Sequence, residues 1–199
     1  MSIRNIANVS LCLALLSGGN GVAAQNESLW HNVDMNQQNR EPRRSAFFAY
    51  GTLDKAQSFY KKKSANYLSM EGMWKFNFVK DHNKRPANFY AASYDDSEWK
   101  DFPVPGLFEL NGHADATYKN VGYAWATQFD PNPPYISELN NYTGSYRSTL
   151  ELHKEWKGKD VYLNVGSDTR NLNLWVNGKS VGYREDSKVA DEFNSSKYL

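Results

Sequence analysis

Adjacent acidic residues are the side chains in this sequence best suited to acid–base chemistry. Three such pairs occur, at Asp95-Asp96, Glu185-Asp186 and Asp191-Glu192. Two carboxyl groups held about 5 Å apart across a glycosidic bond can cleave it, one as nucleophile and the other as acid/base. Neighbouring residues of an extended chain point to opposite faces, however. None of the three is therefore predicted to be a catalytic pair, and no catalytic residue is assigned.

The pair Glu185-Asp186 follows the strongest hairpin signal in the chain. In NLNLWVNGKSVGYREDSK, residues 171–188, Asn177-Gly178 predicts a tight turn because both residues accept positive φ. A rigid hairpin can hold one carboxylate at the rim of a site, where it accepts up to four hydrogen bonds. The hairpin alone does not decide whether Glu185 or Asp186 is that carboxylate. The alternative is that Asp186 is an ordinary loop carboxylate that caps the residues after it.

The segments around this hairpin alternate apolar and polar residues, as half-buried strands do. The pattern is visible in residues 73–79, 145–152, 160–165, 172–176 and 179–183. Gly182 indicates a bulge or a close backbone approach. Only one or two short helical turns are expected, within residues 54–63. The predicted class is all-β, in the form of a sandwich.

The first 24 residues have the pattern of a secretory signal peptide. Arg4 is their only charge, an apolar run follows it, and small residues precede a cleavage site near Ala24. The apolar run is too short to span a bilayer. We expect a secreted or periplasmic protein; the alternative is a buried N-terminal helix. The expected organisation is therefore a signal peptide at 1–24, an extended N-terminal arm at 25–65 and a β-domain at 66–199.

Composition excludes several classes of function. The 199 residues include 23 Lys and Arg against 22 Asp and Glu, and loss of Arg4 with the leader balances them. No basic stripe marks a nucleic-acid surface, and no membrane segment is expected in the mature chain. Cys12, the only cysteine, lies in the leader, so no disulfide or thiol chemistry is predicted for the rest. The 15% of aromatic residues suits a β-protein and also carbohydrate binding, where flat rings cover sugar faces.

Several motifs, in order along the chain, resemble landmarks of one family. They are NREPRR (39–44), LSMEGMWKFNFV (68–79), YDDSEWKDFPVPG (94–106), YKNVGY (118–123), NPPYI (132–136), GSYRSTLEL (144–152) and LWVNGKSVGYREDS (174–187). Together they resemble the N-terminal sugar-binding domain of β-galactosidases of glycoside hydrolase family 2. The resemblance implies a galactose-binding-domain-like jelly-roll β-sandwich, which in the family precedes an immunoglobulin-like domain and a TIM barrel.

The resemblance also implies two substrate-binding residues. Asn120 matches an asparagine that reaches the substrate pocket, and Asp186 matches an aspartate that hydrogen-bonds sugar hydroxyls and in some members helps to hold a sodium ion. On this resemblance we expect the hairpin to hold Asp186 at the site and Glu185 to face solvent. An ordinary turn-forming role is the alternative for Asn120. Family members use magnesium and sodium ions, but no cofactor is expected in this chain itself.

The family's catalytic glutamates lie on the TIM barrel, and a barrel takes about 250 residues. This chain is therefore expected to be inactive alone, with a jelly roll that is incomplete at the C-terminus. Three hypotheses follow: the N-terminal fragment of a secreted β-galactosidase, a free-standing carbohydrate-binding module, or a complementation partner of a separate barrel-bearing chain. The expected partners are a β-galactoside carbohydrate and either the rest of the enzyme or further copies in a homo-oligomer. Galactose, glucuronate and a galactose-containing polysaccharide all remain open as the sugar.

Overall fold

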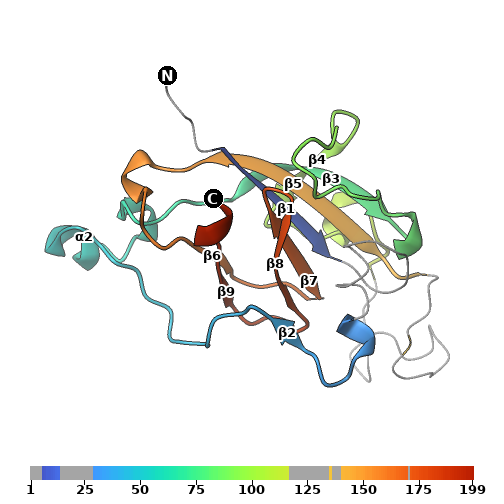
Figure 1. Ribbon diagram of the computed structural model, residues 1–199, viewed down its shortest axis with the longest axis horizontal. Coiled ribbons are helices and arrows are strands. Elements are labelled where there is room, and N and C mark those ends of the chain that lie inside the picture. The colour runs from blue at the N-terminus through green and yellow to red at the C-terminus, as the bar shows by residue number, and fades with distance from the viewer. Residues whose placement is uncertain (1–5, 14–28, 117–134, 136–139, 170) are drawn as a thin grey trace.

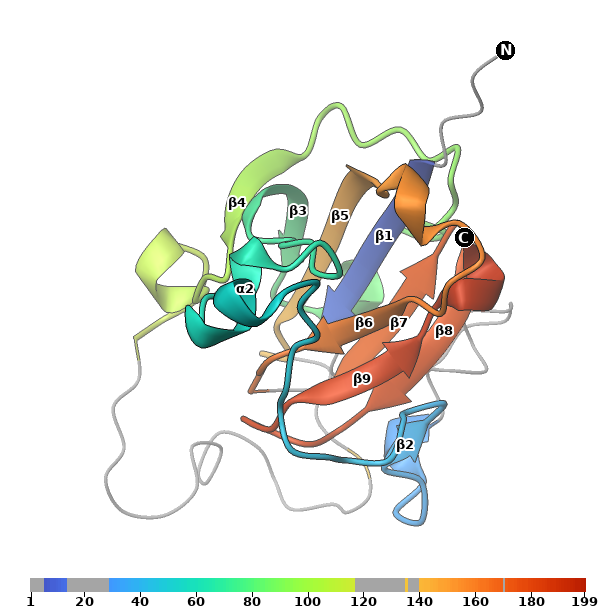
Figure 2. The ribbon, with the colours of Figure 1, turned by 90° about the vertical axis from the view of Figure 1, so that its left-hand side faces the viewer.

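The computed structural model of the chain describes residues 6–13, 29–116, 135, 140–169 and 171–199, with the backbone alone for 6–13 (Figure 1). Two antiparallel sheets dominate it (Figure 2), and the all-β prediction is confirmed. The larger sheet has the order β2-β8-β7-β1-β5-β3-β4 and the smaller pairs β6 with β9. The strands are β1 Ile6–Leu13, β2 Gln37–Gln38, β3 Gly72–Val79, β4 Lys100–Val104, β5 Thr143–Glu151, β6 Tyr162–Val165, β7 Leu172–Val176, β8 Lys179–Arg184 and β9 Asp191–Asn194.

Helical structure within the described residues is short; the turns expected within residues 54–63 are present, whereas five further 3-10 turns outside that range were not predicted. It comprises the α-helix α2 Leu53–Gln57 and the 3-10 turns η1 Leu29–His31, η2 Lys61–Lys63, η3 His82–Lys84, η4 Glu109–Asn111, η5 Lys154–Trp156 and η6 Ser196–Tyr198. Thr52 caps α2 by accepting a hydrogen bond from the Lys55 backbone N–H. None of the helices in this part of the chain is long and apolar enough to cross a membrane.

The main core lies between the two sheets. Trp74 and Phe76 of β3 are buried, as their alternation with polar residues predicts, and they belong to one apolar cluster with Leu174 of β7. The smaller sheet contributes Phe193 of β9, which is fully buried, and the half-buried Leu163 of β6. The molecule is therefore a sandwich in which each sheet buries one face against the other.

A second core covers the opposite face of the larger sheet. Trp175 of β7 and Tyr183 of β8 are buried there against Trp30, Phe89 and Trp99. All five residues of β7 are consequently buried, whereas the sequence predicted one apolar face. The difference arises because the rings that cover the second face come from segments distant in the sequence.

The predicted hairpin is present between β7 and β8. Asn177 and Gly178 have φ values of 51° and 79°, as a turn with two positive φ angles requires. A bulge shifts the register between Leu174 and Trp175, and a Cβ added to Gly182 would lie 2.3 Å from the ring of Phe193. Gly182 therefore fulfils both expectations for a strand glycine: it lies next to a bulge and allows a close approach of the two sheets.

Residues 6–13, within the predicted leader, form the central strand β1. It is antiparallel to β5 on one side and to β7 on the other, so that Leu11 lies opposite both Tyr146 and Leu174. Since adjacent strands are about 4.8 Å apart, β5 and β7 cannot pair directly across the place that β1 takes. Residues 6–13 therefore complete the larger sheet of the intact chain. Cleavage near Ala24 lies outside the described residues and stays a prediction.

The described part of the arm folds back on the domain. Strand β2 pairs with β8, and the backbone N–H of Glu41 donates to the carbonyl of Glu192 over 2.9 Å. Beyond this contact the chain leads to α2, which buries none of its residues and projects from the sandwich (Figure 1). The arm therefore has a docked part, near residues 36–44, and an exposed part around α2.

Candidate functional site

Asp186 lies where the chain leaves β8 on its way to β9, and its side chain is 38% exposed. Two arginines of the arm bind the same oxygen of this carboxylate. Arg40 donates from Nη1 to Oδ2 over 2.7 Å, and Arg43 donates to Oδ2 from Nη2. The hairpin and the docked arm together therefore fix the position of Asp186.

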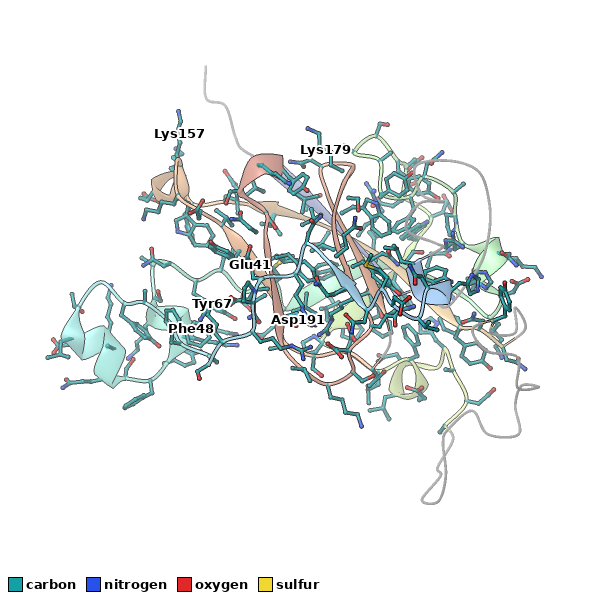
Figure 3. The ribbon with its side chains drawn as sticks, turned by 60° about the horizontal axis from the view of Figure 1, so that its bottom comes forward. Glu41, Phe48, Tyr67, Lys157, Lys179 and Asp191 are labelled. Carbon is teal, nitrogen blue, oxygen red and sulfur yellow. The ribbon has the colours of Figure 1, made fainter. Side chains whose placement is uncertain are left out.

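The same two arginines connect Asp186 to Asp191, whose side chain is completely buried. Their Nε atoms face its Oδ1, over 3.1 Å from Arg43 and 3.6 Å from Arg40. Figure 3 shows Asp191 and Glu41 in the region where the arm meets the β9 strand. The other oxygen of Asp191, Oδ2, pairs with Nη1 of Arg184 over 2.5 Å.

A buried arginine completes this network. Arg184 has no exposed side-chain surface, and its Nη2 lies 2.8 Å from Oδ2 of Asp168. The network therefore runs from Asp168 through Arg184 and Asp191 to Arg40 and Arg43, and ends at the exposed Asp186. Its three arginines balance its three aspartates, as buried charges require.

The electrostatics of Asp186 favour the ionised carboxylate. Partial burial acts to raise its pKa, but the hydrogen bonds from Arg40 and Arg43 outweigh burial and hold the pKa below its ordinary value. An ionised carboxylate accepts hydrogen bonds only. Asp186 can therefore act as an acceptor for ligand hydroxyl groups over the whole physiological pH range.

Glu185 does not face solvent, and that expectation is wrong. It is half-buried, and the hydroxyl of Tyr183 donates a hydrogen bond to its Oε1. Burial raises the pKa of Glu185, and the charge of Asp186 raises it further, although the Tyr183 hydrogen bond opposes both. Burial and the neighbouring carboxylate also raise the pKa of Tyr183. The backbone N–H of Glu185 donates to the carbonyl of Asn36, so this residue too is tied to the arm.

Two guanidinium groups already bind one oxygen of Asp186, and their positive charge weakens the attraction of this carboxylate for a cation. The sodium ion expected at Asp186 stays a prediction. The part of the chain that the structure describes contains no group of three or more His, Cys, Asp or Glu side chains that could hold a metal. The second predicted ligand residue, Asn120, lies outside the described residues, so the structure neither joins it to Asp186 nor separates them.

The other acidic pairs are used structurally. Asp191 points into the core and Glu192 outward, where it pairs with Arg44 over 2.8 Å. Asp95 accepts from the Ser97 backbone N–H, and its neighbour Asp96 pairs with Arg147 over 2.7 Å. Within the described residues, then, the two acids of each of these pairs face different partners.

Sequence reasoning missed Arg40 and Arg43 as part of the site. They lie within the motif NREPRR, which carried the resemblance, but their partners are more than 140 residues further along the chain. Charge alone gives no signal for such a pairing. The order of the motifs was the only available indication that this segment has a role near Asp186.

The fold and the exposed carboxylate at the edge of the sandwich are typical of one class of protein, the β-sandwich domains that bind ligands at the edge of their sheets. Comparison with known proteins gives the family. The profile of "Glycosyl hydrolases family 2, sugar binding domain" matches residues 67–199. The chain belongs to this family, and its fold is the family's jelly roll.

Individual relatives agree with this assignment. The β-galactosidase of Priestia megaterium is 31% identical over 169 residues, and the β-galactosidase of Lactobacillus delbrueckii subsp. bulgaricus is 35% identical over 137 residues. The β-galactosidase large subunit of Leuconostoc lactis is 31% identical over 152 residues. The matches cover 85%, 69% and 70% of this chain, but only 16%, 13% and 24% of the respective relatives.

Proposed function

We propose that this chain is the N-terminal, substrate-contacting portion of a secreted β-galactosidase that hydrolyses terminal non-reducing β-D-galactose residues. It supplies one wall of the pocket and none of the catalytic carboxylates. Asp186 and Asn120 are the proposed contacts to the sugar. The single observation that supports the site is the half-exposed Asp186 carboxylate, fixed between a hairpin and the arm in a domain of a sugar-binding family.

The chemistry of this carboxylate suits a sugar better than an ion. A hydroxyl group can donate to an ionised carboxylate without any change in net charge. Since two arginines already neutralise Asp186, the surroundings offer little net attraction to a cation. A neutral glycoside is therefore the proposed ligand of the Asp186 carboxylate.

Catalysis is proposed to lie in the remainder of the enzyme. A retaining glycosidase needs two carboxyl groups about 5 Å apart, and the adjacent acids of the described residues face different partners. The test is to assay the purified 199-residue chain on a chromogenic β-galactoside. We expect no hydrolysis, and sustained turnover by the chain alone, with contaminating enzyme excluded, would overturn the proposal.

A second candidate function is favoured by the names of some relatives. The proteins of Leuconostoc lactis, Lactobacillus acidophilus and Lactobacillus helveticus are each described as a β-galactosidase large subunit, which implies enzymes built from more than one polypeptide. In this second candidate function, the chain binds a separate polypeptide that carries the catalytic barrel and complements it. Mixing it with the β-galactosidase of Priestia megaterium from which the matching segment has been removed tests this. Recovery of activity is expected, and its absence removes this candidate.

A further inference from the structure

The arm reaches Asp186 with two guanidinium groups that both bind Oδ2. Arg40 donates to this oxygen from Nη1 and Arg43 from Nη2. The second oxygen, Oδ1, has no hydrogen-bond partner among the described residues. The arginines thus bind one oxygen of the carboxylate and leave the other one without a partner in the described part of the chain. More than a third of the Asp186 side chain is accessible to solvent.

We propose that Arg40 and Arg43 are positioning residues for the sugar site: they hold Asp186 through Oδ2 and so present Oδ1 to a hydroxyl group of the glycoside. The inference rests on the proposed function, since it deepens the role given there to Asp186. It assigns a role to two residues of the arm, which lies outside the segment matched by the family profile.

The arrangement is rigid because the arginines are anchored elsewhere. Both Nε atoms face Oδ1 of Asp191, a carboxylate that is fully buried and paired on its other oxygen with the fully buried Arg184. A planar guanidinium that bonds two carboxylates at once has little freedom to rotate. The position of the exposed Asp186 is therefore fixed, through Arg40 and Arg43, by the buried Asp191.

The charge balance explains why two arginines are needed. One would be required to neutralise Asp186 and another to neutralise the oxygen of Asp191 that faces the arm. With both present, the carboxylate stays ionised while the three arginines of the network balance its three aspartates. A fixed, neutralised acceptor favours an uncharged polyhydroxylated ligand and loses less entropy on binding than a mobile one.

The arm contains a matched control. Arg44 belongs to the same motif and is as exposed as Arg43, with 42% against 40% of its side chain accessible. It pairs with Glu192 and not with Asp186. Arg43→Gln and Arg44→Gln therefore remove the same charge from neighbouring residues, but only the first releases the carboxylate.

The experiment is a titration of the 199-residue chain and its variants with methyl β-D-galactopyranoside, followed by ligand-observed NMR. We expect Arg40→Gln and Arg43→Gln each to weaken binding about tenfold, as loss of one charge-assisted contact implies. Arg44→Gln should bind as the unaltered chain does. Arg43→Lys keeps the positive charge but not the planar guanidinium, so it should lose less affinity for the glycoside. It replaces Arg43→Gln in the test if the glutamine variant does not fold. Thermal melts establish that each variant is folded.

A double-variant cycle separates positioning from general stabilisation. Asp186→Asn should abolish most of the affinity, and Arg43→Gln added to it should cause no further loss. If Asp186→Asn weakens binding but Arg43→Gln behaves like Arg44→Gln, the positioning role is wrong and the proposed function stands. If the unaltered chain does not bind the glycoside, or Asp186→Asn binds it equally well, the site assigned under the proposed function fails and the positioning role fails with it.

Discussion

Gly182 of β8 lies directly against the ring of Phe193 of β9, where the two sheets of the sandwich come closest. A Cβ on Gly182 would be 2.3 Å from Cδ1 and 2.4 Å from Cε1 of that ring, and 3.0 Å from the carbonyl oxygen of Gln38. Phe193 has no exposed surface, and the carbonyl belongs to the docked arm. The absence of a side chain at 182 is therefore what allows the smaller sheet to close over β8.

Gly182→Ala should destabilise the domain by about 1–3 kcal/mol, because the added methyl group has no space and the buried ring cannot move aside freely. Gly166→Ala is the control, since a Cβ there meets nothing within 4 Å and the backbone needs no positive φ. Urea denaturation followed by circular dichroism measures both. Equal midpoints for the two variants would contradict the close approach.

Leu11→Pro should destabilise the intact chain strongly. Leu11 lies opposite Tyr146 and Leu174 in the middle of the central strand β1, and proline there removes a backbone donor and leaves buried partners unsatisfied. The expected loss is about 1–3 kcal/mol. The chain has to be produced without export, so that the leader is retained. A thermal melt of the variant beside the unaltered chain measures the loss. Identical melts would show that the leader does not form part of the sheet in solution.

Local pattern was sufficient to predict those parts of the fold whose partners are close in the sequence. The alternation in β3 and the Asn177-Gly178 turn each depend on neighbouring residues, and both are found as expected. Local pattern also placed the pair Glu185-Asp186 after the hairpin, but the choice of Asp186 as the site carboxylate came from the family resemblance. The expectation that Glu185 faces solvent failed, because the Tyr183 hydroxyl that binds it lies on the second buried face of the sheet.

That second face could not be derived from local pattern. Trp30, Phe89 and Trp99 come from three separate segments without strand periodicity, and they meet Trp175 only after the chain has folded. The arginine network has the same origin, with Arg40 and Asp186 separated by 146 positions. Periodicity records which face of a strand is apolar, but it carries no information on which distant segment covers the other face.

Arg184→Met should be among the most damaging single substitutions in the described residues. It leaves Asp191 buried without the Arg184 guanidinium that binds its Oδ2, and it also breaks the ion pair between Arg184 and Asp168. Removing one member of a buried ion pair costs about 3–5 kcal/mol. Lys62→Met is the comparison, because its pair with Glu71 is nearly half exposed on both sides and such surface pairs contribute little to stability. Similar losses of stability in the two variants, measured by urea denaturation, would contradict the burial of the network.

Glu185 and Asp186 should give the domain opposite dependences of stability on pH. The pKa of Asp186 is lowered on folding, so its contribution is present above its unfolded pKa and lost as pH falls through the folded value. The pKa of Glu185 is raised, chiefly by burial, so its protonated form is favoured in the fold. That contribution is complete below the unfolded pKa and is lost as pH rises through the folded pKa.

Glu185→Gln should therefore stabilise the protein at neutral pH and remove the part of the pH dependence that lies above the ordinary glutamate pKa. The amide oxygen can still accept the hydrogen bond of Tyr183, but no charge has to be buried beside Asp186. Thermal melts from pH 4 to pH 8, compared with those of the exposed control Glu98→Gln, measure the effect. If the Glu185→Gln and Glu98→Gln curves run parallel to that of the unaltered chain, Glu185 is not protonated preferentially in the folded state. If Glu185→Gln raises the melting temperature at neutral pH only, burial of the charged Glu185 beside Asp186 destabilises the folded domain.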